Sequence, residues 1–323
     1  MREVLVTLKP SKSKTGRRRP PPQTGRMTWD KLYALIKAGY GQGHGLAYKP
    51  WLRVTKRDYS PSSTVGHLPK PGGHSHHFRA TGEEHLIVLL QWLGAYDVRD
   101  NYPAWPWSHE HPLCGLPGIP SRILRGLLEV ASDAGIDHGV YAGTDIPYVA
   151  TIDILTTWRS GPNEWNVIAH DCKPREIAYE PNPLSRPKER IELLRLYCAE
   201  SGIQRNLAHP EAIPRELWVN LDALHPRIRP EELGRVRASP EYEIIVDACT
   251  RMGYCAPPYD IVSSIEETAA LPKGSLMPFF RLAIWTQDID HDLSLPLETW
   301  HPLIRGGRTL KEHLRQLWCD IAS

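Results

Sequence analysis

Hydrophobic and polar residues alternate with a period of two in two neighbouring segments, residues 148–158 and 163–174. This period is that of a β-strand with one buried face. The RSGPNE sequence that joins the segments is short and rich in turn-forming residues, as a β-hairpin requires. Pro174 has no N–H to donate, so it ends the second strand. The pattern therefore predicts two paired strands.

Apolar residues at helical spacing predict several helices before and after this hairpin. The strongest begins at Thr81, which together with Glu84 forms the pattern of a capping box. In this interpretation Glu84 caps the helix, and Glu83 is available to a site. The helices predicted in the first two thirds of the chain are residues 28–37, 81–95, 123–136 and 186–203, with one more after a strand within 204–226.

Strands and helices thus alternate up to residue 225, which predicts an α/β fold with a mixed central sheet that carries the hairpin. From Pro226 onward the pattern changes to three short helices, a hairpin-like segment at residues 288–300 and a final helix. Three helices and a β wing are the outline of a winged helix, which binds DNA or docks a protein. A small helical bundle with a structural role is the alternative.

The composition separates the chain's beginning from the rest. At 323 residues the chain is long enough for two domains, and 39 Lys and Arg nearly balance 37 Asp and Glu. Residues 1–26, however, contain eight Lys or Arg and one acid, without apolar periodicity. We expect a disordered basic arm that contacts phosphates, or a solubilising tail. The predicted domains are this arm, residues 27–225 and residues 226–323.

The remaining composition excludes several classes of protein. No run approaches the roughly twenty apolar residues of a membrane span, and the basic start lacks the apolar core of a secretory signal, so we expect a cytoplasmic protein. Six cysteines without a CxxC pair indicate neither a disulfide framework nor a zinc ribbon. His74, His76 and His77 lack a complementary ligand pair, which favours a surface or nucleic-acid-facing loop over a zinc site.

The hairpin carries the candidate chemistry. By alternation, Asp171 and Lys173 share one face of the second strand, and Asp153 can lie beside Asp171 on the first. Two carboxylates can hold Mg²⁺, and a lysine can orient water, as metal-assisted phosphodiester hydrolysis requires. The spacing matches the PD-(D/E)xK nuclease signature, with Asp171, Cys172 and Lys173 as its D-x-K. The alternative is an exposed strand pair with an ordinary Asp–Lys ion pair.

Four segments of this chain resemble the TnsA family, the endonuclease subunits of Tn-seven-type transposases. They are GLAYKPWLRV, HSHHFRATGEEHLIVLLQWLGAYDVRDNYP, AGIDH paired with VATIDIL, and HDCKP. They keep their order over residues 40–225, and LPKGSLMPFFRLAIWTQDIDHDLSLPL resembles the family's winged-helix region. The resemblance implies a restriction-endonuclease-like core with catalytic residues Glu83, Asp153 and Lys173. Asp171 falls where relatives carry a carboxylate or an amide.

The resemblance also implies a mechanism and partners. Glu83, Asp153, Asp171 and the main-chain carbonyl of Cys172 would hold Mg²⁺, for which Mn²⁺ substitutes, while Lys173 positions water. The enzyme would cut one strand, on the 5′ side, of double-stranded DNA at transposon ends. A TnsB-like DDE transposase would process the other strand, and a TnsC-like AAA+ ATPase would dock on residues 226–323. It would be a bacterial cytoplasmic protein, associated with the nucleoid when active.

Two other interpretations remain open at this point. A stand-alone restriction or repair nuclease shares the D-x-K core but needs its own sequence-reading surface. A non-catalytic docking module would recruit an ATPase through the winged helix and carry a vestigial acid site. The intact acids and lysine favour an enzyme over the docking module.

Overall fold

The computed structural model describes residues 26–54, 58, 64–179 and 185–319, which form two compact units. The first unit comprises Met1–His44, Tyr48–Leu52 and Arg99–Leu207, and the second comprises Gly45–Ala47, Arg53–Val98 and Ala208–Ser323. The predicted basic arm lies outside the described residues except for Arg26.

This division does not follow the boundary predicted between residues 225 and 226. Residues 53–98 cluster with the carboxy-terminal part of the chain, so the predicted catalytic domain has segments in both units. Compactness and function are different properties, and the assignment of catalysis to residues 27–225 stays a prediction.

The first unit is built on a four-stranded sheet in the order β3-β6-β7-β8. The strands are β3 (Asp97–Ala104), β6 (Ala150–Arg159), β7 (Trp165–Cys172) and β8 (Gln204–Ala208). β6 and β7 pair antiparallel, with Ile154 opposite His170 and Arg159 opposite Trp165. The predicted hairpin is therefore confirmed, and its turn contains the RSGPNE sequence.

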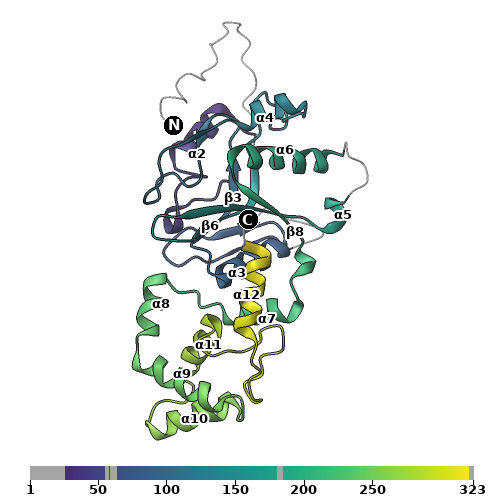
Figure 1. Ribbon diagram of the computed structural model, residues 1–323. Helices are drawn as coiled ribbons and strands as arrows, with labels where there is room; N and C mark the ends of the chain where they lie inside the picture. Colours follow the sequence, from purple (N-terminus) through teal and green to yellow (C-terminus); the bar gives the residue numbers. More distant parts are fainter. Residues whose placement is uncertain (1–25, 55–57, 59–63, 180–184, 320–323) are drawn as a thin grey trace, which may run out of the picture. The chain divides into compact units, whose positions relative to one another are not determined.

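Two helices pack beside one another over this sheet, α4 (Leu127–Ala134) and α6 (Arg186–Ser201) (Figure 1). Leu127 and Leu193 from these helices share a buried core with Leu155, Val167 and Ala169 from the sheet. Leu155 has the same strand parity as Asp153, and Val167 and Ala169 have that of Asp171. The face that carries the two acids is thus the face that the helices cover.

The amino-terminal helix α2 (Trp29–Lys37) covers a second core of the first unit. The side chain of Thr28 accepts a hydrogen bond from the main-chain N–H of Lys31 at 3.2 Å and caps the helix, which was predicted over residues 28–37. Leu32 and Ile36 pack with Trp51, Trp105 and Val149. This core fixes the amino-terminal side of β6. Short segments complete the unit: β4 (His109–Glu110), β5 (Ile123–Leu124) and α5 (Arg175–Ala178).

The second unit is mostly helical and also contains the small sheet of β1 (Gly66–Leu68) and β2 (His76–Phe78). Its helices are α3 (Thr81–Leu93), α7 (Arg215–Leu224), α8 (Pro230–Arg237), α9 (Pro240–Met252), α10 (Pro258–Thr268), α11 (Met277–Thr286) and α12 (Gly307–Cys319), with 3-10 turns η1 (Gly45–Ala47) and η2 (Pro210–Ala212).

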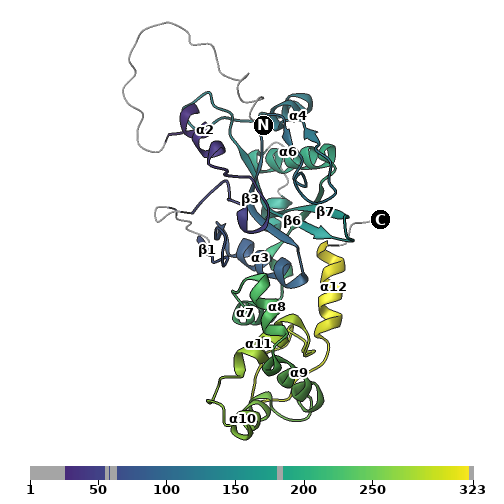
Figure 2. The same ribbon diagram turned by 90° about the vertical axis from the view of Figure 1, so that its left-hand side faces the viewer.

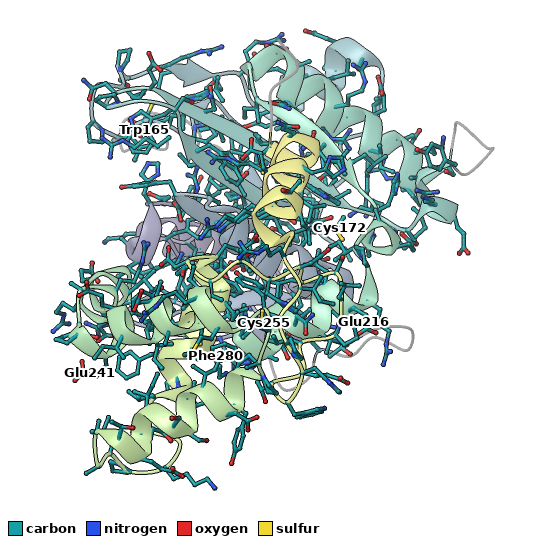
Figure 3. All side chains as sticks on the ribbon, turned by 60° about the horizontal axis from the view of Figure 1, so that its bottom comes forward. Trp165, Cys172, Glu216, Glu241, Cys255 and Phe280 are labelled. Atoms are coloured by element: carbon teal, nitrogen blue, oxygen red, sulfur yellow. The ribbon has the colours of Figure 1, made fainter. Side chains whose placement is uncertain are left out.

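Helices α9, α10 and α11 pack together in this unit (Figure 2). Phe280 of α11 is fully buried, whereas Glu241 at the start of α9 is exposed to solvent (Figure 3). The indole of Trp92 in α3 donates a hydrogen bond to the carbonyl of Trp285 at 2.9 Å. The amphipathic pattern of the sequence therefore predicted these helices correctly.

The hairpin-like segment predicted after α11 is wrong. Residues 287–306 contain no strand, so the predicted winged helix is not confirmed. Side chains bond the backbone here in place of the main-chain hydrogen bonds of a β-ladder. The Asp290 carboxylate accepts from the N–H of Arg308 at 2.9 Å, and the Asp292 carboxylate accepts from the N–H of Ser294 at 2.9 Å. Among the described residues, no helix is long and apolar enough to cross a lipid bilayer.

Candidate active site

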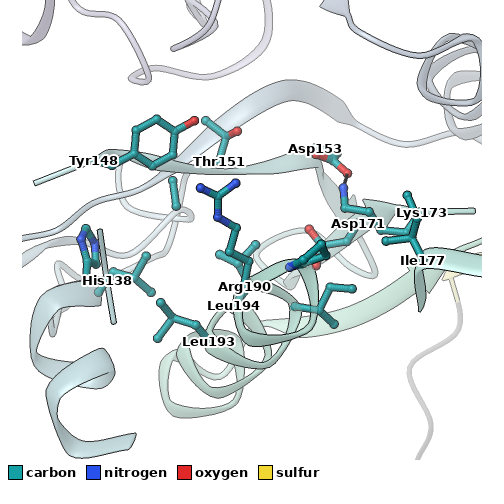
Figure 4. Close-up of a pocket in the computed structure, with 14 residues that line it drawn as sticks. His138, Tyr148, Thr151, Asp153, Asp171, Lys173, Ile177, Arg190, Leu193 and Leu194 are labelled. Carbon is teal, nitrogen blue, oxygen red and sulfur yellow. Dashed lines mark hydrogen bonds and ion pairs between the residues drawn. The ribbon is translucent and has the colours of Figure 1, made fainter. Parts of the chain in front are cut away.

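The antiparallel register of β6 and β7 brings Asp153, Asp171 and Lys173 together in the first unit, as predicted (Figure 4). The Asp153 carboxylate accepts a hydrogen bond from the main-chain N–H of Cys172 at 2.8 Å and forms an ion pair with the Lys173 ammonium. Lys173 also donates to the main-chain carbonyl of Cys172 at 3.2 Å. The Asp153 side chain is 16% exposed and that of Lys173 is 31% exposed, so both can meet a ligand.

Asp171 lies deeper, with its side chain only 2% exposed. Its Oδ2 accepts a hydrogen bond from Nε of Arg205 at 2.5 Å, while its Oδ1 is buried and has no hydrogen-bond partner among the described residues. Burial raises the pKa of Asp171 above its ordinary value, and the nearby charge of Asp153 raises it too, whereas Arg205 opposes the rise. Arg205 therefore favours the ionised form of this buried carboxylate.

Arg205 was not anticipated from the sequence. It comes from β8, which lies next to β7 in the sheet, and its side chain is only 10% exposed. The sequence did contain a signal for such a partner, since a carboxylate on the buried face of a strand requires a cation or hydrogen-bond donors nearby. The sequence alone did not say which of the many arginines would supply it, because strand order was unknown.

The three predicted residues line a cavity of about 340 Å³ between the sheet and α6 (Figure 4). Tyr148 and Thr151 from the β6 side and Arg190 from α6 line it as well, together with apolar side chains such as Leu193. The cavity therefore combines acids, cations and an apolar wall. Arg190, Tyr148 and Thr151 were not among the predicted site residues.

The oxygen donors of this site fit a hard divalent cation. Mg²⁺ in proteins takes one or two carboxylates and completes its shell with waters and substrate phosphates. Asp153 and Asp171 supply two carboxylates, and the buried, unpartnered Oδ1 of Asp171 is the atom that lacks a ligand. Throughout the described part of the chain, no three His, Cys, Asp or Glu side chains form a metal-binding group. The site thus suits an ion that uses few protein ligands.

The residues that alternate with the acids on β7 serve packing. His170 is completely buried, with Nε2 at 3.0 Å from the hydroxyl of Thr156. Burial lowers the pKa of His170 to about 3, so the ring stays neutral near pH 7. The Cys172 side chain is buried too, which agrees with a role limited to its main-chain atoms.

Glu83 belongs to the second unit, where it lies in the first turn of α3. Its carboxylate accepts a hydrogen bond from the main-chain N–H of Arg79 at 2.8 Å. Glu84 was predicted to cap this helix, and that prediction is wrong. The helix has Ala80 as N-cap, one residue earlier than predicted, so Glu83 occupies the third helical position and reaches back to the chain before the helix.

We expect the two neighbouring glutamates to behave differently in spite of this corrected register. Glu83→Gln keeps a hydrogen-bond acceptor for Arg79, so it should cost at most about 1 kcal/mol of stability yet abolish cutting if Glu83 binds the metal. Glu84→Gln should leave cutting intact. Burial and the charge of Asp222 raise the pKa of Glu84, so removing its charge should slightly stabilise the protein at pH 7. Cleavage rates and unfolding midpoints of both variants distinguish the two; loss of cutting in Glu84→Gln alone would reverse the assignment.

The surface or nucleic-acid-facing loop predicted at His74, His76 and His77 is wrong for the last two, which lie in the strand β2. His76 is buried, with Nε2 at 3.2 Å from the side-chain amide of Gln91, and His77 accepts from the N–H of Val54 at 3.1 Å. These three histidines, His74 included, form no metal-binding group within the described residues.

Comparison with known proteins identifies a curated relative. The chain is 30% identical over 171 residues to Transposon Tn7 transposition protein TnsA of Escherichia coli, which is 52% of this chain and 52% of that protein. The chain thus spans about half the length of the curated relative that it matches. No model of a known protein family matches the chain.

Proposed function

We propose, from the TnsA-family assignment that this similarity supports, that the chain is the DNA endonuclease subunit of a transposition system. One observation carries the proposal: a single antiparallel hairpin holds Asp153, Asp171 and Lys173 in one cavity. This is the residue set of metal-assisted phosphodiester hydrolysis. A solvated strand pair would not bury Asp171 against an arginine at 2.5 Å.

Each residue has a distinct part in the proposed reaction. Asp153 and Asp171, with Glu83 and the main-chain carbonyl of Cys172, would hold Mg²⁺, which would supply a polarised phosphoryl oxygen and a more acidic water. Lys173 orients the attacking water and offsets the charge that develops on the phosphate. Arg205 favours the ionised form of Asp171 in its buried position. The enzyme cuts one DNA strand, on the 5′ side of each transposon end, and a second enzyme processes the other strand.

We expect the cleavage to depend on Mg²⁺ or Mn²⁺. The donors are carboxylate and carbonyl oxygens, which suit hard cations, while zinc prefers nitrogen and sulfur ligands. A chelator should abolish cleavage, and added Mg²⁺ or Mn²⁺ should restore it where Zn²⁺ does not. Full activity in chelator, or activity with zinc alone, would contradict this assignment.

The proposed partners act with the two parts of the chain. Double-stranded transposon ends are the substrate, and a TnsB-like DDE transposase is the partner enzyme. A TnsC-like AAA+ ATPase docks on residues 226–323, the part of the chain that carries helices α8 to α12. This last proposal rests on the family resemblance and no longer requires a β wing.

A nicking assay tests the proposed function. Transposon-end DNA with one labelled strand is incubated with the full chain, with and without the partner transposase. Nicking at the 5′ side that requires Lys173 supports the proposal. Cutting of unrelated DNA at the same rate without any partner would favour a stand-alone nuclease, and binding of the ATPase with no cutting under any condition would favour a docking module.

A further inference from the structure

The three arginines of α6 differ in their partners. Arg186 is ion-paired with Glu189 at 3.1 Å, and Arg195 is ion-paired with Glu192 at 2.7 Å. Arg190, which lies between them in the sequence, pairs with no carboxylate among the described residues, and it is the one of the three that lines the active-site cavity. Arg190 is therefore an exposed cation beside the proposed phosphodiesterase site, with no anion partner among the described residues.

The surroundings of Arg190 provide further ligand groups. Its guanidinium lies 5.9 Å from the ring centroid of Tyr148, and Figure 4 shows it reaching from α6 toward Tyr148 and Thr151. Thr151 lies two residues before Asp153 on β6, so the two side chains share a strand face. The Thr151 hydroxyl makes no hydrogen bond among the described residues, so it is available to donate to a ligand.

The size of the cavity also exceeds the needs of an ion. A water molecule occupies roughly 30 Å³ in the liquid, so 340 Å³ corresponds to about ten waters. An ion with its carboxylates and a few waters fills only part of this volume. Leu193 and Leu194 line the remainder with apolar surface, which suits a sugar ring rather than solvent.

We propose that Arg190, Thr151 and Tyr148 form a subsite for the sugar-phosphate next to the scissile bond of the cut DNA strand. The inference deepens the proposed function and rests on it. A guanidinium presents paired N–H donors that match phosphate oxygens, and arginine also stacks on an aromatic ring. Thr151 donates a second hydrogen bond to the same phosphate. Tyr148 holds the guanidinium in place and packs against the deoxyribose.

Salt dependence of DNA binding tests this subsite. Affinity of the full chain for a short fluorescent duplex is measured over a range of salt concentrations, with Ca²⁺ in place of Mg²⁺. Each phosphate contact contributes about 0.9 to the slope of log K against log salt. Arg190→Ala should therefore lower the slope by about 0.9 and weaken binding about tenfold or more at the lowest salt, since hydrogen bonds to charged groups are strong.

Two matched variants make the result decisive. Arg195→Ala removes a paired arginine of the same helix and should leave the slope unchanged, and Arg190→Lys should restore the slope but not all of the affinity. Equal effects of Arg190→Ala and Arg195→Ala, or an unchanged slope in Arg190→Ala, would overturn the subsite. A wild-type chain that binds no duplex at any salt concentration would instead count against the proposed function itself, so the two failures are separable.

Discussion

Replacing Arg205 with methionine is expected to destabilise the protein by about 3 kcal/mol or more, because it leaves the buried carboxylate of Asp171 without its cation. Methionine keeps much of the side-chain volume, so the loss reports on charge rather than on a cavity. Urea unfolding of the full chain at pH 7 measures the difference in free energy. Arg195→Met serves as the control, since it breaks an exposed ion pair and should cost less than about 1 kcal/mol.

The double variant Asp171→Asn with Arg205→Met identifies the cause. If Arg205 acts by compensating the charge of Asp171, the amide should recover at least half of the stability lost in Arg205→Met. If the free-energy losses of the two single variants simply add in the double variant, Arg205 stabilises the protein through other contacts. Mn²⁺ binding by Arg205→Met should also weaken, because the Asp171 carboxylate then takes up a proton. Arg195→Met should bind Mn²⁺ as the wild type does.

Lys173→Met should reduce the rate of strand cleavage by about a thousandfold. The ammonium is ion-paired with Asp153 at the edge of the cavity, where it can reach both the attacking water and the phosphate. Single-turnover cleavage with saturating protein measures the chemical step. Binding of duplex DNA should change only slightly, since one phosphate contact at most is lost.

A matched lysine on α6 controls for the loss of charge. Lys188 does not line the cavity, and Lys188→Met should cleave at the wild-type rate. If Lys173→Met cleaves as fast as Lys188→Met, then Lys173 supports the fold of the hairpin and takes no part in catalysis. An unfolding midpoint close to that of the wild type is needed for either result to count.

The local pattern was enough to predict the hairpin and the acids on it. Alternation placed Asp171 and Lys173 on one face, and the RSGPNE turn fixed the antiparallel pairing that brings Asp153 alongside. Local rules failed where an alternative bonding pattern was close in energy. The start of α3 moved by one residue, which gave the third helical position to Glu83 in place of Glu84, and the segment after α11 took side-chain bonds instead of a ladder.

The sequence by itself determined the elements and the chemistry of the hairpin, because both depend on residues close together in the chain. Only the tertiary structure decided which cations meet these acids. Arg205 reaches Asp171 from 34 residues away because β8 lies beside β7, and Arg190 faces the cavity because α6 packs over that face. Which distant segments come into contact depends on strand order and helix packing. Local periodicity carries no information about either.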